Sequence, residues 1–456
     1  MSIIRYTDPD KATPEDLQRL KAYEMNASRS YFALADCNNF FVSCERMFRP
    51  DLRDRPVIVL SNNDGCVISR SNEAKKLGIP MGIPLFKIRD LVHRYNIAVF
   101  SSNFSLYLDM SNRVYTMLSG FAPEVERYSI DEAFLNLTGY SRTYNNFDYC
   151  LEIRHRVTHD IGIPVCVGGA STKTLAKIAN HCAKKGILPG GVMTIDTDDE
   201  RIFALKNTPL DDIWGIGRAL NERFGREYGI RNAYELSLLN PAEIKKKFNI
   251  TTANIITELN GISCIPMDSQ PQPRKQIMWS RTFGHHITEL TELSQIVADF
   301  IVKAAEKLRE DRQYAGIISI YIQTNLASAR DRHYSRQAYA RLNIRTCDTT
   351  ELLSAGLRVL NGIFAPGYLY YKAGVILEDL SASRESQMDL FDAEPESEEL
   401  REKRAKLQMA VDRLNARKQN TVFLAAQGMY ARSGISRQER KSPAYTTSWK
   451  DVPKVK

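Results

Sequence analysis

The sequence predicts a multidomain α+β protein, and three observations carry that prediction. The chain of 456 residues is long enough for about two to four domains. Short apolar strands alternate with helical patterns from residue 31 to about residue 199. A mainly helical stretch follows up to residue 264, and a second α/β pattern occupies residues 277–382.

Hydrophobic and turn patterns place the elements of the N-terminal half. Apolar runs bounded by turn residues indicate buried strands, the first of which ends in Asp36 and Cys37. Gly78 and Pro80 end the helix that follows the third strand. The expected strands are 31–37, 56–60, 65–71 and 164–170, with extended runs in 125–139, and the expected helices are 40–48, 72–78, 105–121, 147–161 and 171–185.

The middle of the chain is expected to form a helical domain that ends in a linker. WGIGR (214–218) lies between two helical runs, and Gly215 and Gly217 let backbone N–H groups point outward toward a phosphate. GxG alone is weak evidence, but between short helices it indicates a helix–hairpin–helix. Residues 265–276 contain three prolines and few apolar side chains, so they are the expected linker.

Composition excludes several classes of protein. Charged residues make up 25% of the chain and apolar residues 43%, so wholesale disorder is excluded. No apolar run reaches about 18 residues, and the N-terminus lacks the apolar core of a secretory signal. The eight cysteines form no CxxC pair, as expected for buried free thiols of a cytoplasmic protein.

The charge is distributed unevenly along the chain. Of the net +8, residues 403–456 carry +10, so residues 1–402 are close to neutral at −2. Residues 385–400 hold seven acidic and no basic side chains, and we expect them to form a solvated loop. The basic surplus at the end of the chain suits a partner or a loose contact with a polyanion better than catalysis.

Three carboxylates are candidates for a metal site. Asp36 ends an apolar strand, where a carboxylate costs free energy unless a cation pairs with it. Asp131 and Glu132 lie among apolar residues, and both reach one site only at a strand end or in a hairpin. Hard cations such as Mg²⁺ prefer a few carboxylates together with substrate phosphates. A solvated hairpin is the alternative, and sequence spacing does not show that these residues meet Asp36.

Two groups of polar and cationic side chains are candidates for binding an anion. The first group lies on a single face of helix 171–185 and consists of Lys173, Lys177, His181 and Lys184. The second group lies at the end of the third strand and after it, and consists of Ser69, Arg70, Asn72 and Lys75. The alternatives are a solvated cationic helix face for the first group and ordinary surface for the second.

Residues 326–345 carry five arginines, with two tyrosines interleaved. Because side chains two positions apart share a strand face, Arg330, Arg332 and Arg336 are expected to form a row that suits phosphates. An edge strand protected by its charge is the alternative interpretation.

Five segments, in this order, resemble the Y-family DNA polymerases and above all their UmuC branch: FALADCNNFFVSCE, PVIVLSNNDGCVISRSNEAKKLGI, YSIDEAFLNLTG, GGASTKTLAKIANHCAKK and DDIWGIGR. The resemblance covers residues 31–382, and the tail that ends in SPAYTTSWKDVPKVK is similar as well. Residues 1–30 depart from the family and form an N-terminal extension. The family fold is a right-hand polymerase, which implies a palm (31–47 and 107–199), fingers (48–106), a thumb (200–264), a little finger (277–382), an acidic linker (383–402) and a basic tail (403–456).

The resemblance also implies roles for individual residues. Asp36, Asp131, Glu132 and the backbone carbonyl of Cys37 match the ligands of two Mg²⁺ ions. Phe41 lies where an aromatic ring excludes a ribose 2′-OH, and Phe40 packs nearby. The residues that match those holding the incoming triphosphate are Ser69, Asn72, Lys75 and Lys184, of which the first three differ in type from other branches.

QMDLF (387–391) lies in the acidic stretch, where its apolar side chains have no core to join. Exposed apolar residues in such a segment usually serve docking, and chance exposure is the alternative. The segment resembles the docking peptide for the sliding clamp, with Gln387, Leu390 and Phe391 as anchors. The partners implied by the resemblance are primer–template DNA, dNTPs, the clamp, a processed UmuD-type dimer and a RecA-type recombinase filament.

The predicted function is that of an error-prone translesion DNA polymerase without proofreading, acting in the SOS response in the cytoplasm at the nucleoid. One alternative is a non-catalytic DNA- and clamp-binding regulator of the same fold, against which the intact carboxylate set argues. The other is a DinB-type lesion-bypass polymerase, against which SNNDGCVISR and the long tail argue.

Overall fold

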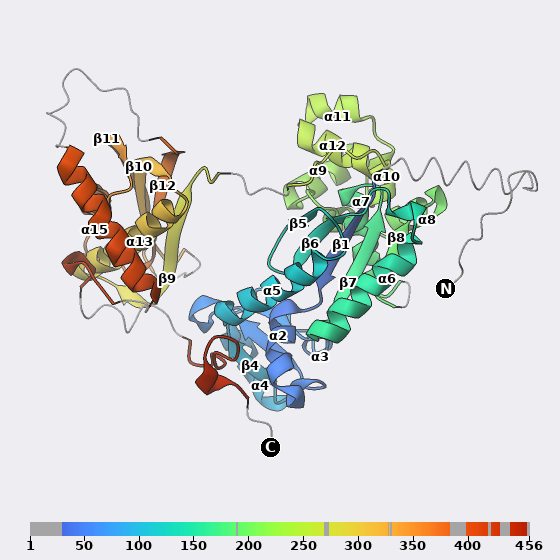
Figure 1. Ribbon diagram of the computed structural model, residues 1–456, viewed down its shortest axis with the longest axis horizontal. Helices are drawn as coiled ribbons and strands as arrows, with labels where there is room; N and C mark the ends of the chain where they lie inside the picture. Colours follow the sequence, from blue (N-terminus) through green and yellow to red (C-terminus); the bar gives the residue numbers. More distant parts are fainter. Residues whose placement is uncertain are drawn as a thin grey trace, which may run out of the picture. The chain divides into compact units, whose positions relative to one another are not determined.

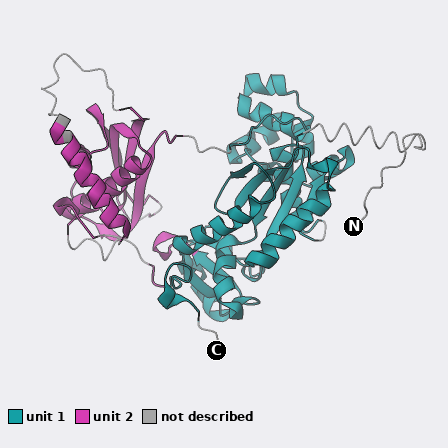
Figure 2. Ribbon diagram, viewed as in Figure 1, with its two compact units in different colours: residues 1–59, 66–270, 440–456 teal, residues 60–65, 271–439 magenta. Residues whose placement is uncertain are grey.

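The structure, a computed structural model, describes residues 30–187, 190–268, 273–326, 328, 331–383, 398–417, 421–428 and 438–453. It divides into two compact units, residues 1–59, 66–270 and 440–456 in the first and residues 60–65 and 271–439 in the second (Figure 2). The division falls inside the predicted linker. Arg330, the anchors Gln387, Leu390 and Phe391, and residues 1–29 of the predicted extension lie outside the described residues.

A five-stranded sheet forms the centre of the first unit, in the order β5-β6-β1-β7-β8 (Figure 1). Its strands are β1 (Phe32–Cys37), β5 (Val125–Arg127), β6 (Glu132–Asn136), β7 (Val165–Ala170) and β8 (Val192–Ile195). β1 is buried along its whole length because it lies between two antiparallel neighbours and both of its faces are covered. Phe32 and Leu34 point into one core, and Ala33 and Ala35 into the other.

Helices cover both faces of this sheet. One face packs on α2 (Phe40–Phe48), α5 (Phe104–Leu118) and α6 (Asn146–Arg156, continued by the π-turn η6, Val157–Ile161), and the other packs on α7 (Lys173–Lys184). η5 (Tyr140–Arg142) precedes α6. Helix α7 approaches β7 so closely that a Cβ at Gly168 would collide with the backbone of Asn180. Gly168 therefore lets α7 bring its lysines down onto the sheet.

A three-stranded sheet in the order β3-β2-β4 lies between α2 and α5 in the chain. Its elements are η2 (Pro50–Leu52), β2 (Val57–Leu60), η3 (Asn62–Asp64), β3 (Val67–Arg70), α3 (Asn72–Lys76), η4 (Leu85–Ile88), α4 (Arg89–Arg94) and β4 (Ala98–Ser101). The Ser71 hydroxyl caps α3 by accepting the Ala74 N–H, and it also accepts the Val57 N–H. One serine thus joins the start of α3 to β2.

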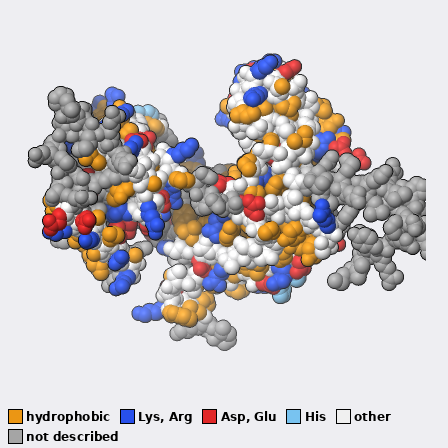
Figure 3. All heavy atoms as spheres, turned by 45° about the horizontal axis from the view of Figure 1, so that its top comes forward, with side chains coloured by type: hydrophobic (Ala, Val, Ile, Leu, Met, Phe, Trp, Pro, Cys, Tyr) orange, Lys and Arg blue, Asp and Glu red, His pale blue; other side chains and the backbone are white. Residues whose placement is uncertain are grey.

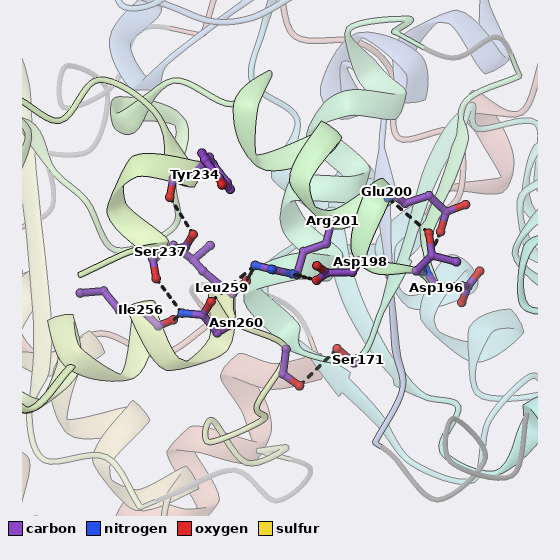
Figure 4. A network of polar contacts seen from close by, with 12 residues as sticks. Ser171, Asp196, Asp198, Glu200, Arg201, Tyr234, Ser237, Ile256, Leu259 and Asn260 are labelled. Carbon is purple, nitrogen blue, oxygen red and sulfur yellow. Dashed lines mark hydrogen bonds and ion pairs between the residues drawn. The ribbon is translucent and has the colours of Figure 1, made fainter. Parts of the chain in front are cut away.

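The helical part of the first unit contains α8 (Asp198–Lys206), η7 (Leu210–Asp212), α9 (Arg218–Tyr228), α10 (Ala233–Ser237), α11 (Pro241–Lys247) and α12 (Ile250–Leu259). Figure 4 shows how these helices are tied together by polar contacts. Arg201 of α8 forms an ion pair with Asp198 and donates to the Leu259 carbonyl at 3.1 Å. Asn260 donates to the Ser237 carbonyl at 2.8 Å, which closes α10 against the end of α12.

The second unit is built on a four-stranded antiparallel sheet in the order β11-β10-β12-β9. Its strands are β9 (Ile277–Ile287), β10 (Tyr314–Thr324), β11 (Ser335–Thr346) and β12 (Tyr370–Ser381), and its core helices are α13 (Leu290–Glu310) and α14 (Thr349–Ile363). Apolar side chains of both helices and of one sheet face form a single core. This agrees with the expected separate α/β domain.

The C-terminal basic region is not one independent tail. Helix α15 (Glu398–Arg417) begins inside the stretch 385–400 that was expected to be a loop, and η8 (Ala425–Gln427) follows it. Arg309 of α13 pairs with Asp412 at 2.7 Å, so α15 belongs with the second unit. Residues from Arg440 onward, including η9 (Trp449–Asp451), belong with the first unit instead.

The surface and the cysteines complete the description. Among the described residues, no helix combines the length and the apolar character needed to cross a membrane. On the face drawn in Figure 3, basic side chains are scattered among acidic and apolar ones.

Five of the eight cysteine thiols are buried, and Cys264 is exposed.

Candidate active site

The ends of two central strands bring two of the predicted ligands together. β1 pairs with β6 in an antiparallel register that places Asp36 opposite Glu132. Both residues have the parity of Leu34 and Phe134, which pack toward α7, so their side chains lie on the face that α7 covers. Asp36 is only 7% exposed.

Asp131 lies in the turn that precedes β6. The backbone N–H groups of Tyr128 and Ser129 donate to the Glu132 carbonyl, which closes this turn, and the Asp131 carbonyl accepts the Cys37 N–H at 2.9 Å. The Asp131 carboxylate accepts the Ser129 hydroxyl at 2.6 Å. The turn therefore places Asp131 beside the end of β1, while its carboxylate is held by Ser129.

Two lysines of α7 pair with the opposed carboxylates. Lys184 forms an ion pair with Asp36, and Lys177 Nζ lies 3.1 Å from Glu132 Oε1. The interpretation of this helix face as a solvated cationic surface is wrong for Lys177, whose side chain is only 16% exposed. Lys184 is exposed to solvent but still pairs with Asp36.

Burial dominates the electrostatics of Asp36. Burial raises the pKa of the Asp36 carboxyl, Lys184 opposes this rise and the charge of Glu132 adds to it, so that the pKa is about 7. A carboxyl with a pKa this far above its usual value has less positive charge around it than its ionised form requires. The site therefore has room, in electrostatic terms, for a further cation.

The donor atoms fit Mg²⁺, although the side chains do not form a finished metal cage. Within the ranges that the structure describes, no group of three or more His, Cys, Asp or Glu side chains is arranged to hold a metal ion. The reason is local, since Ser129 holds Asp131, and lysines pair with Asp36 and Glu132. Burial raises the pKa of the Cys37 thiol, so the thiol stays protonated and does not serve as a thiolate ligand. Carboxylate and carbonyl oxygens are the ligands that Mg²⁺ prefers.

Phe41 lies in the first turn of α2, directly after the strand that carries Asp36. Its ring stacks on Tyr107 of α5 with 4.5 Å between centroids and 16° between planes, and it meets Phe104 edge-on at 5.9 Å. Phe40 is 3% exposed and belongs to the core, whereas Phe41 is only partly buried. Of the two phenylalanines, Phe41 is therefore the one that can contact a substrate.

A second group of cations comes from β3 and α3. The pKa of Lys75 is lowered, first by burial and then by the positive charges of Arg70 and Lys184. Like charges brought together in this way repel one another unless an anion neutralises them. Lys75, Arg70 and Lys184 are thus close enough to interact, and Lys184 also pairs with Asp36.

The two remaining predicted triphosphate residues lie on the same elements. Ser69 is buried on β3, and Asn72 is exposed in the first turn of α3. The Asn72 side-chain amide oxygen accepts the Asn39 side-chain N–H at 3.1 Å, which ties α3 to the residue before α2. Asn39 has φ 49°, a left-handed conformation that asparagine tolerates.

The two glycines of the hairpin before α9 differ in what they require. Gly215 has φ +89°, and a Cβ there would lie 2.7 Å from the side chain of Ile255, so this position needs glycine. Gly217 is the N-cap of α9 and has open space around it. Its backbone leads into a helix N-terminus, which favours negative charge.

The predicted arginine row is wrong as drawn from the sequence. β11 begins only at Ser335, so Arg332 precedes the strand, and its guanidinium lies 5.0 Å from the ring centre of Tyr368. Arg336 is the second residue of β11 and is exposed. Strand alternation was applied to residues outside the strand, and Arg330 lies outside the described residues.

Sequence reasoning did not give three contacting residues a place in the site. Lys177 and Trp214 were named only as parts of a helix face and a motif, and Tyr128 was missed. The Trp214 indole N–H donates to the Tyr128 hydroxyl at 2.9 Å, and both rings contact Lys177, at 5.4 and 4.2 Å from its Nζ. The signal was present, since Trp214 opens the WGIGR motif and Lys177 shares the Lys184 helix face. Only the fold shows that they meet.

Comparisons with known proteins agree with this geometry. The model of the impB/mucB/samB family matches residues 35–181, and the model of that family's C-terminal domain matches residues 274–390. A domain of unknown function (DUF4113) matches residues 405–455. Protein SamB and Protein UmuC of Salmonella typhimurium are each 40% identical to the chain, covering 93% of it and 99% and 100% of their own lengths.

More distant matches extend the comparison. DNA polymerase IV 2 of Mesorhizobium japonicum is 36% identical over 204 residues, which is 44% of this chain and 46% of that protein. A solved Y-family DNA polymerase chimera, Dbh-Dpo4(243-245)-Dbh, superposes with a TM-score of 0.60 at 22% identity, covering 76% of this chain and 98% of its own. Protein SamB and Protein UmuC match over nearly their whole length, whereas DNA polymerase IV 2 matches over less than half of its length.

The fold is that of a DNA polymerase, with Asp36 and Glu132 paired on the five-stranded sheet and with lysines of α7 beside them. The chain belongs to the impB/mucB/samB family of Y-family DNA polymerases. It is an error-prone translesion DNA polymerase.

Proposed function

We propose that this polymerase joins deoxynucleotides to a primer 3′-OH, opposite damaged template bases, with two Mg²⁺ ions held by Asp36, Asp131, Glu132 and the Cys37 carbonyl. The observation that supports this most directly is the pairing of Asp36 with Glu132 on a buried sheet face, where burial raises the pKa of Asp36 to about 7. Two Mg²⁺ ions held by these residues would supply positive charge that lowers the pKa of the primer 3′-OH and offsets the charge of the pyrophosphate leaving group.

The residues of this chain then have separate tasks. The carboxylates hold charge at the end of β1, and Lys184 and Lys75 bind the phosphates of the incoming dNTP as point charges. Arg70 adds a third positive charge beside them. Ser69 and Asn72 supply neutral hydrogen bonds, and the Phe41 ring covers the sugar, with Phe40 supporting it from the core.

The experiment that tests this function is primer extension on a template with one abasic site, using the intact chain with its accessory partners and clamp. We expect insertion opposite the abasic site with Mg²⁺, loss of insertion after chelation, and recovery when Mg²⁺ is restored. Extension that stops at the lesion would contradict the bypass activity. DNA binding without any extension would favour the non-catalytic regulator.

Lys184→Ala is expected to raise the KM for dNTP by about 10- to 100-fold, because a charge-assisted contact to phosphate is worth roughly 1.5–3 kcal/mol. Steady-state insertion kinetics on undamaged template measure this effect. Lys185→Ala is the matched control, since Lys185 is the next residue and pairs with Asp212 outside the carboxylate site. Equal KM values for the two variants would remove Lys184 from the phosphate site.

DNA contacts are proposed at the hairpin of Gly215 and Gly217 and at the arginines Arg330, Arg332 and Arg336. Support for the hairpin comes from the position of Gly217 at the N-terminus of α9, where backbone N–H groups can bind a phosphate. Support for the arginines is their charge and, for Arg336, its exposure on an edge strand.

Partners are proposed from the resemblance and from the sequence. Gln387, Leu390 and Phe391 are proposed to dock the sliding clamp, and a processed UmuD-type dimer and a RecA-type filament are proposed to act with the polymerase. A cytoplasmic site of action at the nucleoid follows from the DNA substrate. The boundaries of the palm, fingers and thumb given from the sequence stay predictions.

A further inference from the structure

We infer that the last described segment of the chain, residues 440–453, positions the aromatic ring that selects the sugar of the incoming nucleotide. We call these residues the C-terminal strap. The inference rests on the proposed role of Phe41. The strap lies within the match to a domain of unknown function, residues 405–455, and in the first unit.

The strap begins beside β4 of the three-stranded sheet β3-β2-β4. Ser101, the last residue of β4, donates its N–H to the Arg440 carbonyl at 3.0 Å, and its hydroxyl accepts the Arg440 N–H at 3.0 Å. Ser101 and Lys441 then form a parallel bridge. The contact therefore has defined backbone register rather than side-chain contacts alone.

Buried polar contacts fix the next residues of the strap. The Asn103 side chain donates to the Ser442 carbonyl at 3.2 Å and to the Ser442 hydroxyl at 2.9 Å. Asn103 is 2% exposed and Ser442 is 7% exposed. The Tyr445 ring stacks on Phe48 of α2, with 4.6 Å between centroids and 9° between planes. Such burial is typical of an integral part of a core and not of a loosely associated tail.

Ser442 also reaches a carboxylate inside the protein. Glu45 of α2 is fully buried, and its Oε1 accepts the Ser442 hydroxyl at 3.0 Å and the Tyr107 hydroxyl at 2.7 Å. Among the described residues, Glu45 Oε2 has no hydrogen-bond partner. A buried carboxyl depends on the donors it has, so Ser442 supplies one of the two that hold Glu45 in place.

The same carboxyl holds the residue on which the sugar gate rests. The Tyr107 hydroxyl is bonded to Glu45, and the Tyr107 ring stacks on Phe41 at 4.5 Å. Direct contacts thus run from Ser442 to Glu45, from Glu45 to Tyr107 and from Tyr107 to Phe41. Loss of the first contact is expected to free the Tyr107 ring and, through it, the Phe41 ring. Ser442 is a positioning residue in this scheme.

The test is single-nucleotide insertion of dCTP and of CTP opposite template dG by the intact chain. We expect Ser442→Ala to lower the ratio of kcat/KM for dCTP to that for CTP by about fivefold or more, mainly through more efficient CTP insertion. Ser442→Thr keeps the hydroxyl and should keep the ratio. Trp449→Ala is the matched control within the strap, because Trp449 is 95% exposed.

A double-mutant cycle separates positioning from a general structural effect. In a Phe41→Ala background, Ser442→Ala should change the ratio no further, because its route to the sugar is gone. Tyr107→Phe, which keeps the ring and removes its hydrogen bond to Glu45, should shift the ratio in the same direction as Ser442→Ala. It serves as the second variant if Ser442→Ala fails to fold.

The outcomes distinguish the two levels of the proposal. An unchanged ratio in Phe41→Ala would overturn the gate itself. A lowered ratio in Phe41→Ala with an unchanged ratio in Ser442→Ala and Tyr107→Phe would overturn the strap inference alone. The strap inference would also be overturned if Ser442→Ala lowered dCTP and CTP insertion equally and did the same in the Phe41→Ala background.

Discussion

Replacing Asp131 and Glu132 together by alanine is expected to abolish primer extension, with a loss of about a thousandfold or more, because charge stabilisation by bound metal ions is worth several kcal/mol. Glu132 lies opposite Asp36 on the buried sheet face, and Asp131 lies at the turn beside it. Without these two carboxylates, Asp36 alone would face Lys184, and one carboxylate does not hold two divalent ions. Extension of an undamaged primer–template in Mg²⁺ measures the effect.

The control for this experiment removes the same charge elsewhere. Asp109→Ala with Asp160→Ala deletes two surface carboxylates that pair with Arg113 and Arg156 one helical turn away. Such exposed pairs contribute little to stability, so extension should stay near the wild-type rate. Melting temperature and DNA binding of both double variants show whether the fold is kept. Extension retained by the Asp131 and Glu132 variant would end the assignment of these residues.

Phe41→Ala is expected to lower the discrimination between dNTP and rNTP by about a hundredfold, which corresponds to roughly 2.7 kcal/mol. The Phe41 ring is held between the face of Tyr107 and the edge of Phe104, so it cannot turn aside to admit a 2′-OH. Removal of the ring opens space for the hydroxyl without touching the carboxylates. The ratio of kcat/KM values for matched deoxy- and ribonucleotides measures the change.

Phe41→Tyr is the matched variant because it keeps the ring and its stacking surface. It should keep most of the discrimination, whereas the alanine variant should lose it. Discrimination that is equal in wild type and Phe41→Ala would assign sugar selection to another residue.

The carboxylate set shows how far sequence reasoning reached. Asp36 is a candidate metal ligand because it ends an apolar strand. Asp131 and Glu132 are candidates because they form an acidic pair among apolar residues. Both patterns are costly unless a cation is present, so the chemistry of the site was predictable. That Asp36 and Glu132 meet was not, because antiparallel pairing between residues far apart in sequence leaves no local signal.

The lysines and the arginines show the opposite limits. Periodicity correctly put Lys177 and Lys184 on one helix face, but it could not distinguish a solvated face from one pressed against a sheet. The close packing at Gly168 made the difference. The arginine row failed because strand parity holds only within a strand, and β11 begins at Ser335.

By itself, the sequence determined the family, the α+β class and the order of elements, and it predicted a carboxylate site for metal ions. These depend on local patterns and on residue identities, which can be recognised without knowing the long-range contacts. Tertiary structure decided which charges face one another and where the C-terminal basic region goes. One part of that region packs with the second unit, and residues 440–453 bury Ser442 against Glu45 in the first. A serine in a basic stretch carries no sign of this, because burial of a polar group becomes favourable only when the fold supplies its partners.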